Sequence, residues 1–230
     1  MDPIKDIVAK VLTETKERPT NPESTTTPSI EALRGWETFF RYRTLNDPIL
    51  VNAMVQAARF YKSMLRPTEW DQSTGKPVSS GKWLTLLGGS GVGKTHLARA
   101  VFQRWMELPM WYQPFGKDWG PKCVLDGRFV DWRAQTESFQ RGDYTAVDDL
   151  CDFDFVVLDD IGAEHDPSGI GKSKLDRILN SRLLKNTVIT SNLMLDQIRD
   201  RLDERIASRL IRNDSVIIEL TVPDFNIRTK

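Results

Sequence analysis

The stretch LLGGSGVGKTHLARAVFQRW, residues 86–105, has four glycines among six residues and then continues directly as a helical pattern. It contains the pattern G-x-x-x-x-G-K-[ST] of the phosphate-binding loop, at Gly88, Gly93, Lys94 and Thr95. The apolar run WLTLL before it (residues 83–87) predicts a buried strand, so the motif has the strand–loop–helix context that it requires. We therefore predict a nucleoside triphosphate site formed by Gly88, Gly89, Ser90, Gly91, Val92, Gly93, Lys94, Thr95 and His96.

The residue types in this loop suit phosphate chemistry. Glycines let backbone N–H groups turn toward phosphate oxygens, and the N-terminus of the following helix adds partial positive charge. Lys94 is expected to reach the β- and γ-phosphates, and the hydroxyl of Thr95 is expected to bind Mg²⁺.

Composition limits the class of protein. The 230 residues include 32 Lys plus Arg and 32 Asp plus Glu, so any contact with nucleic acid must come from a local patch. Cys123 and Cys151 lack metal-ligand spacing, and we expect both to be reduced. No apolar run reaches membrane-spanning length and no signal-peptide pattern opens the chain, which predicts a soluble cytoplasmic protein that does not enter a membrane.

The N-terminal region predicts a helix on a tether. Within residues 1–16 one apolar stripe recurs at helical spacing, formed by Ile4, Ile7, Val8, Val11 and Leu12. Residues 17–29, rich in Pro, Thr and Ser, predict a flexible linker. The helix could pack on its own domain or present a face to a partner, and the sequence leaves both possibilities open.

The rest of the chain alternates between apolar strands and amphipathic helices. A helical lead-in opens a domain at residues 30–222, with a second lead-in helix starting at Asn46 or Asp47, and residues 223–230 form a tail. Further strands are expected around 123–125, 153–164, 186–192 and 215–220, and helices at 132–139, 172–184 and, as one long segment, 195–211. This alternation predicts an α/β fold with a parallel, doubly wound sheet. The Trp- and Pro-rich residues 106–122 receive no assignment.

Polar residues end two of the predicted strands. FDFVVLDDIGAE (residues 153–164) ends in acids, which parallel sheets bring to the edge where ligands bind. Asp159 is expected in the metal's shell and Asp160 beside the attacking water, with Glu164 a weaker alternative for the second role. Asn192 follows the next strand, where it could orient water or merely cap a helix.

An arginine-rich segment allows two interpretations. Arg205 and Arg209 are four residues apart and share a helix face, with Arg201 and Arg212 at its flanks. They could form a solvated face paired with nearby acids. Alternatively, one of them could be an arginine finger that completes a neighbouring subunit's site.

Four segments in this order, GVGKTHLARA, VVLDDIGAE, VITSNL and ERIASRL, resemble the AAA+ ATPases of the DnaC-type helicase-loader and IstB-type transposition-helper group, with DnaA a more distant relative. The resemblance covers residues 36–220 and implies a P-loop AAA+ sheet flanked by helices, without a C-terminal lid and with a short helical N-terminal extension. It also implies ATP and Mg²⁺ as ligands and slow hydrolysis that depends on assembly. The resemblance implies that Lys94 and Thr95 act in the phosphate loop, Asp159 and Asp160 as the acidic pair, and Asn192 as the first sensor. It places the arginine finger at Arg209, with Arg205 as a second candidate.

The chain departs from the group in two respects. Only about thirty residues precede the lead-in, where loaders usually carry a larger helicase-binding domain. Near the end, an aromatic residue followed directly by Arg often acts as a second sensor. Here Arg228 lies three residues after Phe225, so this role transfers weakly.

The leading hypothesis is a helicase loader that forms an ATP-dependent spiral or ring on single-stranded DNA and holds a replicative helicase. The main alternative is a transposition helper that binds duplex DNA and recruits a transposase. A small-molecule kinase and a non-hydrolysing ATP-binding adaptor are weaker hypotheses. Candidate DNA contacts, each with solvated surface as the alternative, are Lys172, Lys174 and the arginines of FQRGDY and DGRFVDWR.

Overall fold

A computed structural model describes residues 39, 42, 44, 47–64, 69–70, 77–78, 81–106, 126–212 and 215–228. The predicted helix at 1–16, the linker at 17–29, the strand around 123–125 and Cys123 lie outside these residues, while the other cysteine, Cys151, is a free thiol. Within the described part of the chain, no helix combines the length and apolar character needed to cross a membrane.

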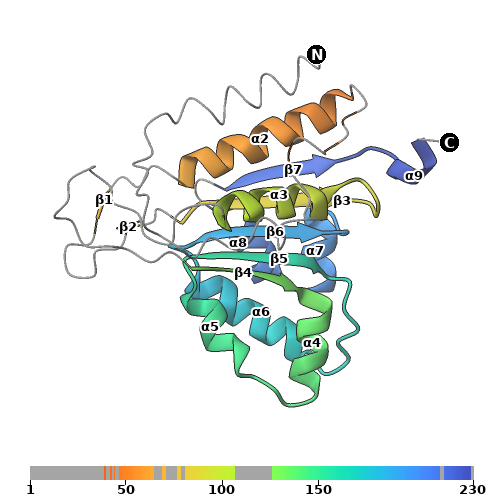
Figure 1. Ribbon diagram of the computed structural model, residues 1–230. Coiled ribbons are helices and arrows are strands. Elements are labelled where there is room, and N and C mark those ends of the chain that lie inside the picture. The colour runs from red at the N-terminus through yellow and green to blue at the C-terminus, as the bar shows by residue number, and fades with distance from the viewer. Residues whose placement is uncertain are drawn as a thin grey trace, which may run out of the picture.

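A five-stranded, all-parallel sheet forms the centre of the molecule, in the order β4–β5–β6–β3–β7 (Figure 1). The strands are β3 (Trp83–Gly88), β4 (Gly127–Asp131), β5 (Phe155–Ile161), β6 (Asn186–Ser191) and β7 (Val216–Leu220). The short strands β1 (Glu69–Trp70) and β2 (Pro77–Val78) pair separately. β3 lies inside the sheet between β6 and β7, so the predicted parallel sheet is confirmed.

Helices cover both faces of the sheet (Figure 1). On one face lie α2 (Pro48–Met64) and α3 (Lys94–Met106), packed against alternate strand residues such as Leu84 and Leu86. The other face buries Trp83 and Leu87 against α4 (Trp132–Gln140), α5 (Ala146–Asp152), α6 (Ile170–Ser181), α7 (Leu195–Arg201) and α8 (Glu204–Leu210). Burial on both faces explains why β3 and the first half of β5 are mainly apolar, while β6 is buried along its whole length although it contains Asn186, Thr187, Thr190 and Ser191. The chain ends its described part in α9 (Phe225–Arg228).

Three predicted boundaries were wrong. The segment DGRFVD, which lies after the strand expected around 123–125 and received no strand prediction, contains β4, whose backbone pairs with β5 from Gly127↔Phe155 to Asp131↔Asp159. The long helix expected at 195–211 is two helices, since the Asp203 carboxylate accepts from the backbone N–H of Arg205 and caps α8. Helix α6 ends at Ser181 rather than continuing to residue 184.

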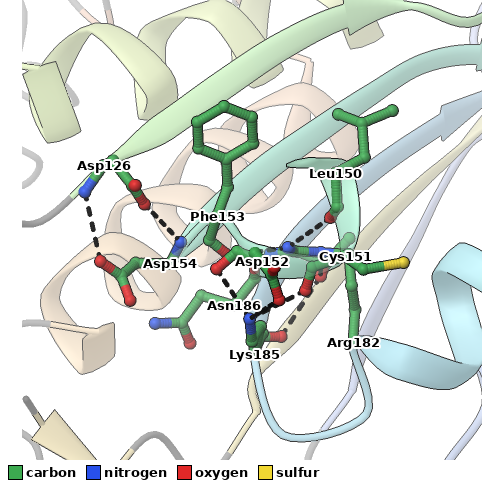
Figure 2. A network of polar contacts seen from close by, with 10 residues as sticks. Asp126, Leu150, Cys151, Asp152, Phe153, Asp154, Arg182, Lys185 and Asn186 are labelled. Carbon is green, nitrogen blue, oxygen red and sulfur yellow. Dashed lines mark hydrogen bonds and ion pairs between the residues drawn. The ribbon is translucent and has the colours of Figure 1, made fainter. Parts of the chain in front are cut away.

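A buried arginine holds the amino-terminal edge of the sheet together. The Arg182 side chain is fully buried and donates to the carbonyls of Leu150 (2.9 Å), Phe153 (2.7 Å) and Asn186 (2.6 Å). Lys185 donates to two further carbonyls at the end of α5 (Figure 2). Because the last carbonyls of a helix lack partners within it, these two cations cap α5 and fix it against β5 and β6.

We expect Arg182→Met to lower the free energy of unfolding by about 3 kcal/mol or more, because it leaves buried carbonyls without a donor. Burial already lowers the pKa of Arg182 to about 10, which still leaves it charged at neutral pH. Arg177→Met is the matched control, since Arg177 pairs with Asp148 on the exposed surface and its loss should cost no more than about 0.5 kcal/mol. Urea unfolding measures both variants, and equal losses would contradict this account.

Candidate nucleotide-binding site

The glycine-rich loop connects β3 to α3 and requires glycine for two separate reasons. Gly91 and Gly93 have φ angles of +69° and +100°, which side-chain-bearing residues rarely adopt. A Cβ atom at Gly93 would come within 2.7 Å of the Tyr42 ring, and one at Gly91 would meet the Asp224 carboxylate. The backbone N–H of Phe225 also donates to the Gly91 carbonyl at 3.0 Å. The loop is therefore held from two sides, by the lead-in and by the start of α9.

Lys94 connects the loop to β6. Its side chain is buried, and its ammonium group donates to the carbonyls of Gly88 (2.9 Å) and Gly89 (2.6 Å) and to Asn192 Oδ1 (2.7 Å). Burial lowers the pKa of Lys94, while the nearby Asp160 and Asp159 carboxylates act in the opposite direction. A cation held among carbonyl and amide oxygens in this way is suited to a phosphate anion.

Two hydroxyls meet at Asp159, near the carboxyl end of β5. Thr95, in the first turn of α3, donates to Asp159 Oδ1 at 2.9 Å, and Thr190 on β6 donates to the same oxygen at 2.7 Å. The predicted pair of Thr95 and Asp159 is thus brought into contact. A hydroxyl and a carboxylate are hard oxygen donors of the kind that Mg²⁺ prefers, so these two residues fit such an ion.

Asp160 has an unusual backbone conformation. Its φ of +63° makes it the one non-glycine residue of the described chain with positive φ, at an irregularity in the pairing of β5 with β6. Its N–H donates to Thr190 Oγ1 at 2.8 Å, and its carboxylate accepts from Asn192 Nδ2 at 2.5 Å. Burial, and then the charge of Asp159, raise the pKa of Asp160. The chain therefore brings the second acid and Asn192 together.

Glu164, the weaker alternative to Asp160, accepts hydrogen bonds with both of its carboxylate oxygens. One carboxylate oxygen accepts from the indole N–H of the buried Trp132 at 3.2 Å, and the other accepts from the N–H of Gly162 at 2.6 Å. Burial raises the pKa of this carboxyl. Because both oxygens are engaged, Glu164 stabilises the turn after β5 and joins it to α4.

The two finger candidates do not share an environment. The Arg209 side chain is 16% exposed and forms an ion pair with Asp176 on α6, with a second contact to Asn180 Oδ1 at 3.4 Å. Arg205 is exposed, at the start of α8. The flanking Arg201 and Arg212 are exposed as well. The arrangement therefore separates one restrained arginine from three solvated ones.

The candidate DNA contacts are mostly at the surface. Both lysines have partners, and the Arg133 guanidinium forms an exposed ion pair with Glu137 at 3.6 Å. Lys172 forms an ion pair with Asp203 at 3.3 Å, and the Lys174 ammonium lies 4.6 Å from the centre of the Tyr144 ring. The arginines of the two candidate segments, Arg128, Arg133 and Arg141, are exposed. The side chain of Arg228, the candidate second sensor, lies outside the described part of the chain.

Sequence reasoning missed three residues that contact the site. Tyr42 packs against Gly93 and lies edge-on to the His96 ring, with centroids 5.2 Å apart. Asp224 lies against Gly91, and Thr190 contacts both acids of β5. Thr190 stands two residues before Asn192 in the quoted segment VITSNL, which placed it near the end of its strand, but its contacts with the acids, like those of the other two residues, depend on tertiary structure.

We expect Asp160→Asn to stabilise the protein in the absence of nucleotide and divalent cation. The folded state raises the pKa of Asp160, so stability is lost as pH rises from the unfolded-state pKa through the folded-state pKa. The neutral amide avoids this loss and tolerates positive φ. Urea unfolding should show a gain at pH 7 of less than about 1 kcal/mol, because solvent partly screens the carboxyl, and a smaller gain at pH 4. A loss at pH 7, or a gain that grows on acidification, would contradict this reasoning.

Comparison with known proteins gives structural neighbours only. No protein-family model matches the chain, and no curated protein matches it. The crystal structure of the DnaC helicase loader aligns with a TM-score of 0.58 and 19% identity, over 80% of this chain and 96% of that one. DnaI aligns with a TM-score of 0.56 and 25% identity, over 84% and 92%. Domain III of the Thermotoga maritima replication initiation protein DnaA gives 0.55 and 19%, over 83% and 69%.

The match to these neighbours covers the parallel sheet and the helices that flank it. The resemblance inferred from the quoted segments is therefore confirmed for the architecture. The chain has the P-loop AAA+ fold of the DnaC, DnaI and DnaA proteins.

Proposed function

We propose that this chain is an ATP-dependent switch of the helicase-loader type, which assembles on single-stranded DNA and uses hydrolysis to release the assembly. One observation carries the proposal. At the carboxyl edge of the parallel sheet, Asn192 joins Lys94 to Asp160 and Thr95 donates to Asp159, and the Thr190 hydroxyl connects these two groups into one set of hydrogen bonds. Ligands of open α/β sheets bind at this edge, and phosphoryl transfer needs a cation, a metal ligand and a polarising carboxylate close together.

The loop binds and orients the triphosphate in this proposal. Backbone N–H groups of residues 88–93 and the N-terminus of α3 attract the phosphates, and Lys94 exchanges its carbonyl partners for phosphate oxygens. Thr95 and Asp159 would hold Mg²⁺, directly or through its water. When bound by these residues, Mg²⁺ would supply positive charge that offsets the negative charge of the phosphate oxygens.

Asp160 and Asn192 position the attacking water. Asn192 contacts the Lys94 ammonium through its oxygen and the Asp160 carboxylate through its nitrogen, so it lies between the phosphate-binding cation and the acid. The raised pKa of Asp160 favours its acting as a proton acceptor from water. In this proposal Asn192 sets the position of the Asp160 carboxylate relative to the γ-phosphate, which is the role of a first sensor.

Arg209 acts on the site of a neighbouring subunit. In the single chain its guanidinium is neutralised by Asp176, and it must exchange this partner for the neighbour's γ-phosphate. Because a phosphate carries more charge than one carboxylate, ATP at the neighbouring site favours the exchange, and ADP favours it less. This competition couples the state of the nucleotide to assembly, as a two-state switch requires.

The helicase-loader proposal is preferred to the transposition helper because DnaC, a helicase loader, and DnaI are among the structural neighbours. Binding to single-stranded DNA uses the exposed basic residues Arg128, Arg133 and Arg141 in this proposal, and the predicted N-terminal helix holds the helicase. Preference for a single-stranded over a duplex oligonucleotide distinguishes the two functions, since a helper that bends DNA prefers the duplex.

A subunit-mixing experiment tests the trans action of Arg209. Lys94→Ala removes the phosphate-binding cation but keeps Arg209, whereas Arg209→Ala keeps the nucleotide site and loses the finger. We expect each variant alone to hydrolyse ATP at least tenfold more slowly than the wild type, in the presence of Mg²⁺ and a single-stranded oligonucleotide. Their mixture should recover a clear fraction of the wild-type rate, because each supplies what the other lacks.

Arg212→Ala is the matched control for the finger, since Arg212 is exposed and lies three residues from Arg209. It should hydrolyse ATP at close to the wild-type rate. Arg205→Ala tests the second finger candidate in the same mixture. Full activity of Arg209→Ala by itself would remove Arg209 from the mechanism.

A further inference from the structure

Thr190 contacts both acidic residues of β5 with one hydroxyl group. The side chain is fully buried on β6, where its backbone pairs with Leu86 of β3. Its oxygen accepts from the Asp160 N–H at 2.8 Å, and its hydrogen is donated to Asp159 Oδ1 at 2.7 Å. The hydroxyl has only one hydrogen, so these two bonds fix its orientation.

The Thr190 hydroxyl accepts the hydrogen bond of a backbone N–H where the regular pairing of β5 with β6 is interrupted. β5 and β6 pair regularly up to Leu158↔Ile189, and the register then shifts before Ile161↔Ser191. Asp159 and Asp160 lie in that irregularity, and the left-handed conformation at Asp160 turns its N–H toward the Thr190 side chain. Such a conformation costs free energy in a non-glycine residue and persists only where neighbouring groups hold it.

The second bond sets the orientation of the Asp159 carboxylate. Thr190 and Thr95 both donate to Oδ1, from β6 and α3, and among the described residues no hydrogen bond falls on Oδ2. The hydroxyl of Thr190 therefore links β6 directly to the Asp159 carboxylate and fixes where that carboxylate points. Groups that hold a metal-binding carboxylate in this way usually change metal affinity or activity 10- to 100-fold when they are removed.

We propose that Thr190 is a positioning residue for hydrolysis, which holds Asp159 for Mg²⁺ and keeps the left-handed turn that presents Asp160. The inference rests on the proposed function for its consequences in catalysis, but its structural part concerns the protein without nucleotide. It predicts that the hydroxyl matters, rather than the volume of the side chain.

Thr190→Val and Thr190→Ser separate these two properties. Valine keeps the branched shape and removes the hydroxyl, whereas serine keeps the hydroxyl. Thr85→Val is the matched control, because Thr85 is an equally buried threonine on the neighbouring strand β3 and its hydroxyl has no hydrogen-bond partner among the described residues. Thermal unfolding identifies any variant that fails to fold, and Thr190→Ser keeps the inference testable if Thr190→Val does fail.

Hydrogen exchange of the segment 158–161, in protein without nucleotide, tests the structural part. We expect the Asp160 amide to exchange at least tenfold faster in Thr190→Val, and at close to the wild-type rate in Thr190→Ser and Thr85→Val. Unchanged protection in Thr190→Val would overturn the inference, whether or not the protein hydrolyses ATP.

Steady-state hydrolysis across a Mg²⁺ titration tests the catalytic part. Thr190→Val should lower kcat 10- to 100-fold and raise the Mg²⁺ concentration for half-maximal rate, with a much smaller change in KM for ATP. Thr190→Ser should restore most of the rate. Equal impairment of both variants would mean that packing, not the hydroxyl, is responsible, and would overturn the inference. A wild-type protein that does not hydrolyse ATP, together with the expected exchange result, would instead contradict only the proposed function.

Discussion

The Asp159 carboxylate joins three separate elements at the carboxyl edge of the sheet. It belongs to β5, and its Oδ1 atom accepts hydroxyl hydrogens from Thr95 at the start of α3 and from Thr190 on β6. Other side-chain contacts also bridge β5 and β6 here, from Ser191 Oγ to the Ile161 carbonyl and between Asn192 and Asp160. The candidate metal ligand, the first turn of α3 and β6 meet at the one buried carboxylate of Asp159.

The charges of two residues at this edge are in unfavourable surroundings, which nucleotide binding can change. Lys94 and Asp160 both lie where burial disfavours their charged forms, as the directions of their pKa shifts indicate. On α8, the partly exposed Arg209 is restrained by its ion pair with Asp176 of α6. Functional sites commonly lower the stability of the protein without ligand, because backbone strain and unfavourable charge are tolerated where they serve binding. Opposite the site, the Arg182 network keeps the amino-terminal edge of the sheet rigid.

Much of the sheet could be predicted because β3 and the start of β5 are apolar runs, and β3 leads directly into a specific loop motif. β4 escaped because it is an edge strand, half exposed, and its residues include Gly127 and Arg128, so pairing with β5 rather than propensity defines it. The break between α7 and α8 was not predicted because Asp203 lies within a continuous helical pattern in the sequence. Its role as the N-cap of α8 becomes clear only from the hydrogen bond that it accepts from the Arg205 N–H. Motif spacing identified Asp159, Asp160 and Asn192. It could not supply the bridge through Thr190, which depends on the local irregularity between β5 and β6.

The central claim, a nucleotide-dependent switch that works by self-assembly, is tested most directly by size-exclusion chromatography with light scattering. The protein is measured with ATP and Mg²⁺, and with ADP and Mg²⁺, each with and without a single-stranded oligonucleotide. The account predicts growth from a monomer to a higher-order species when ATP and the oligonucleotide are both present, and little growth with ADP. A monomer under every condition would contradict it.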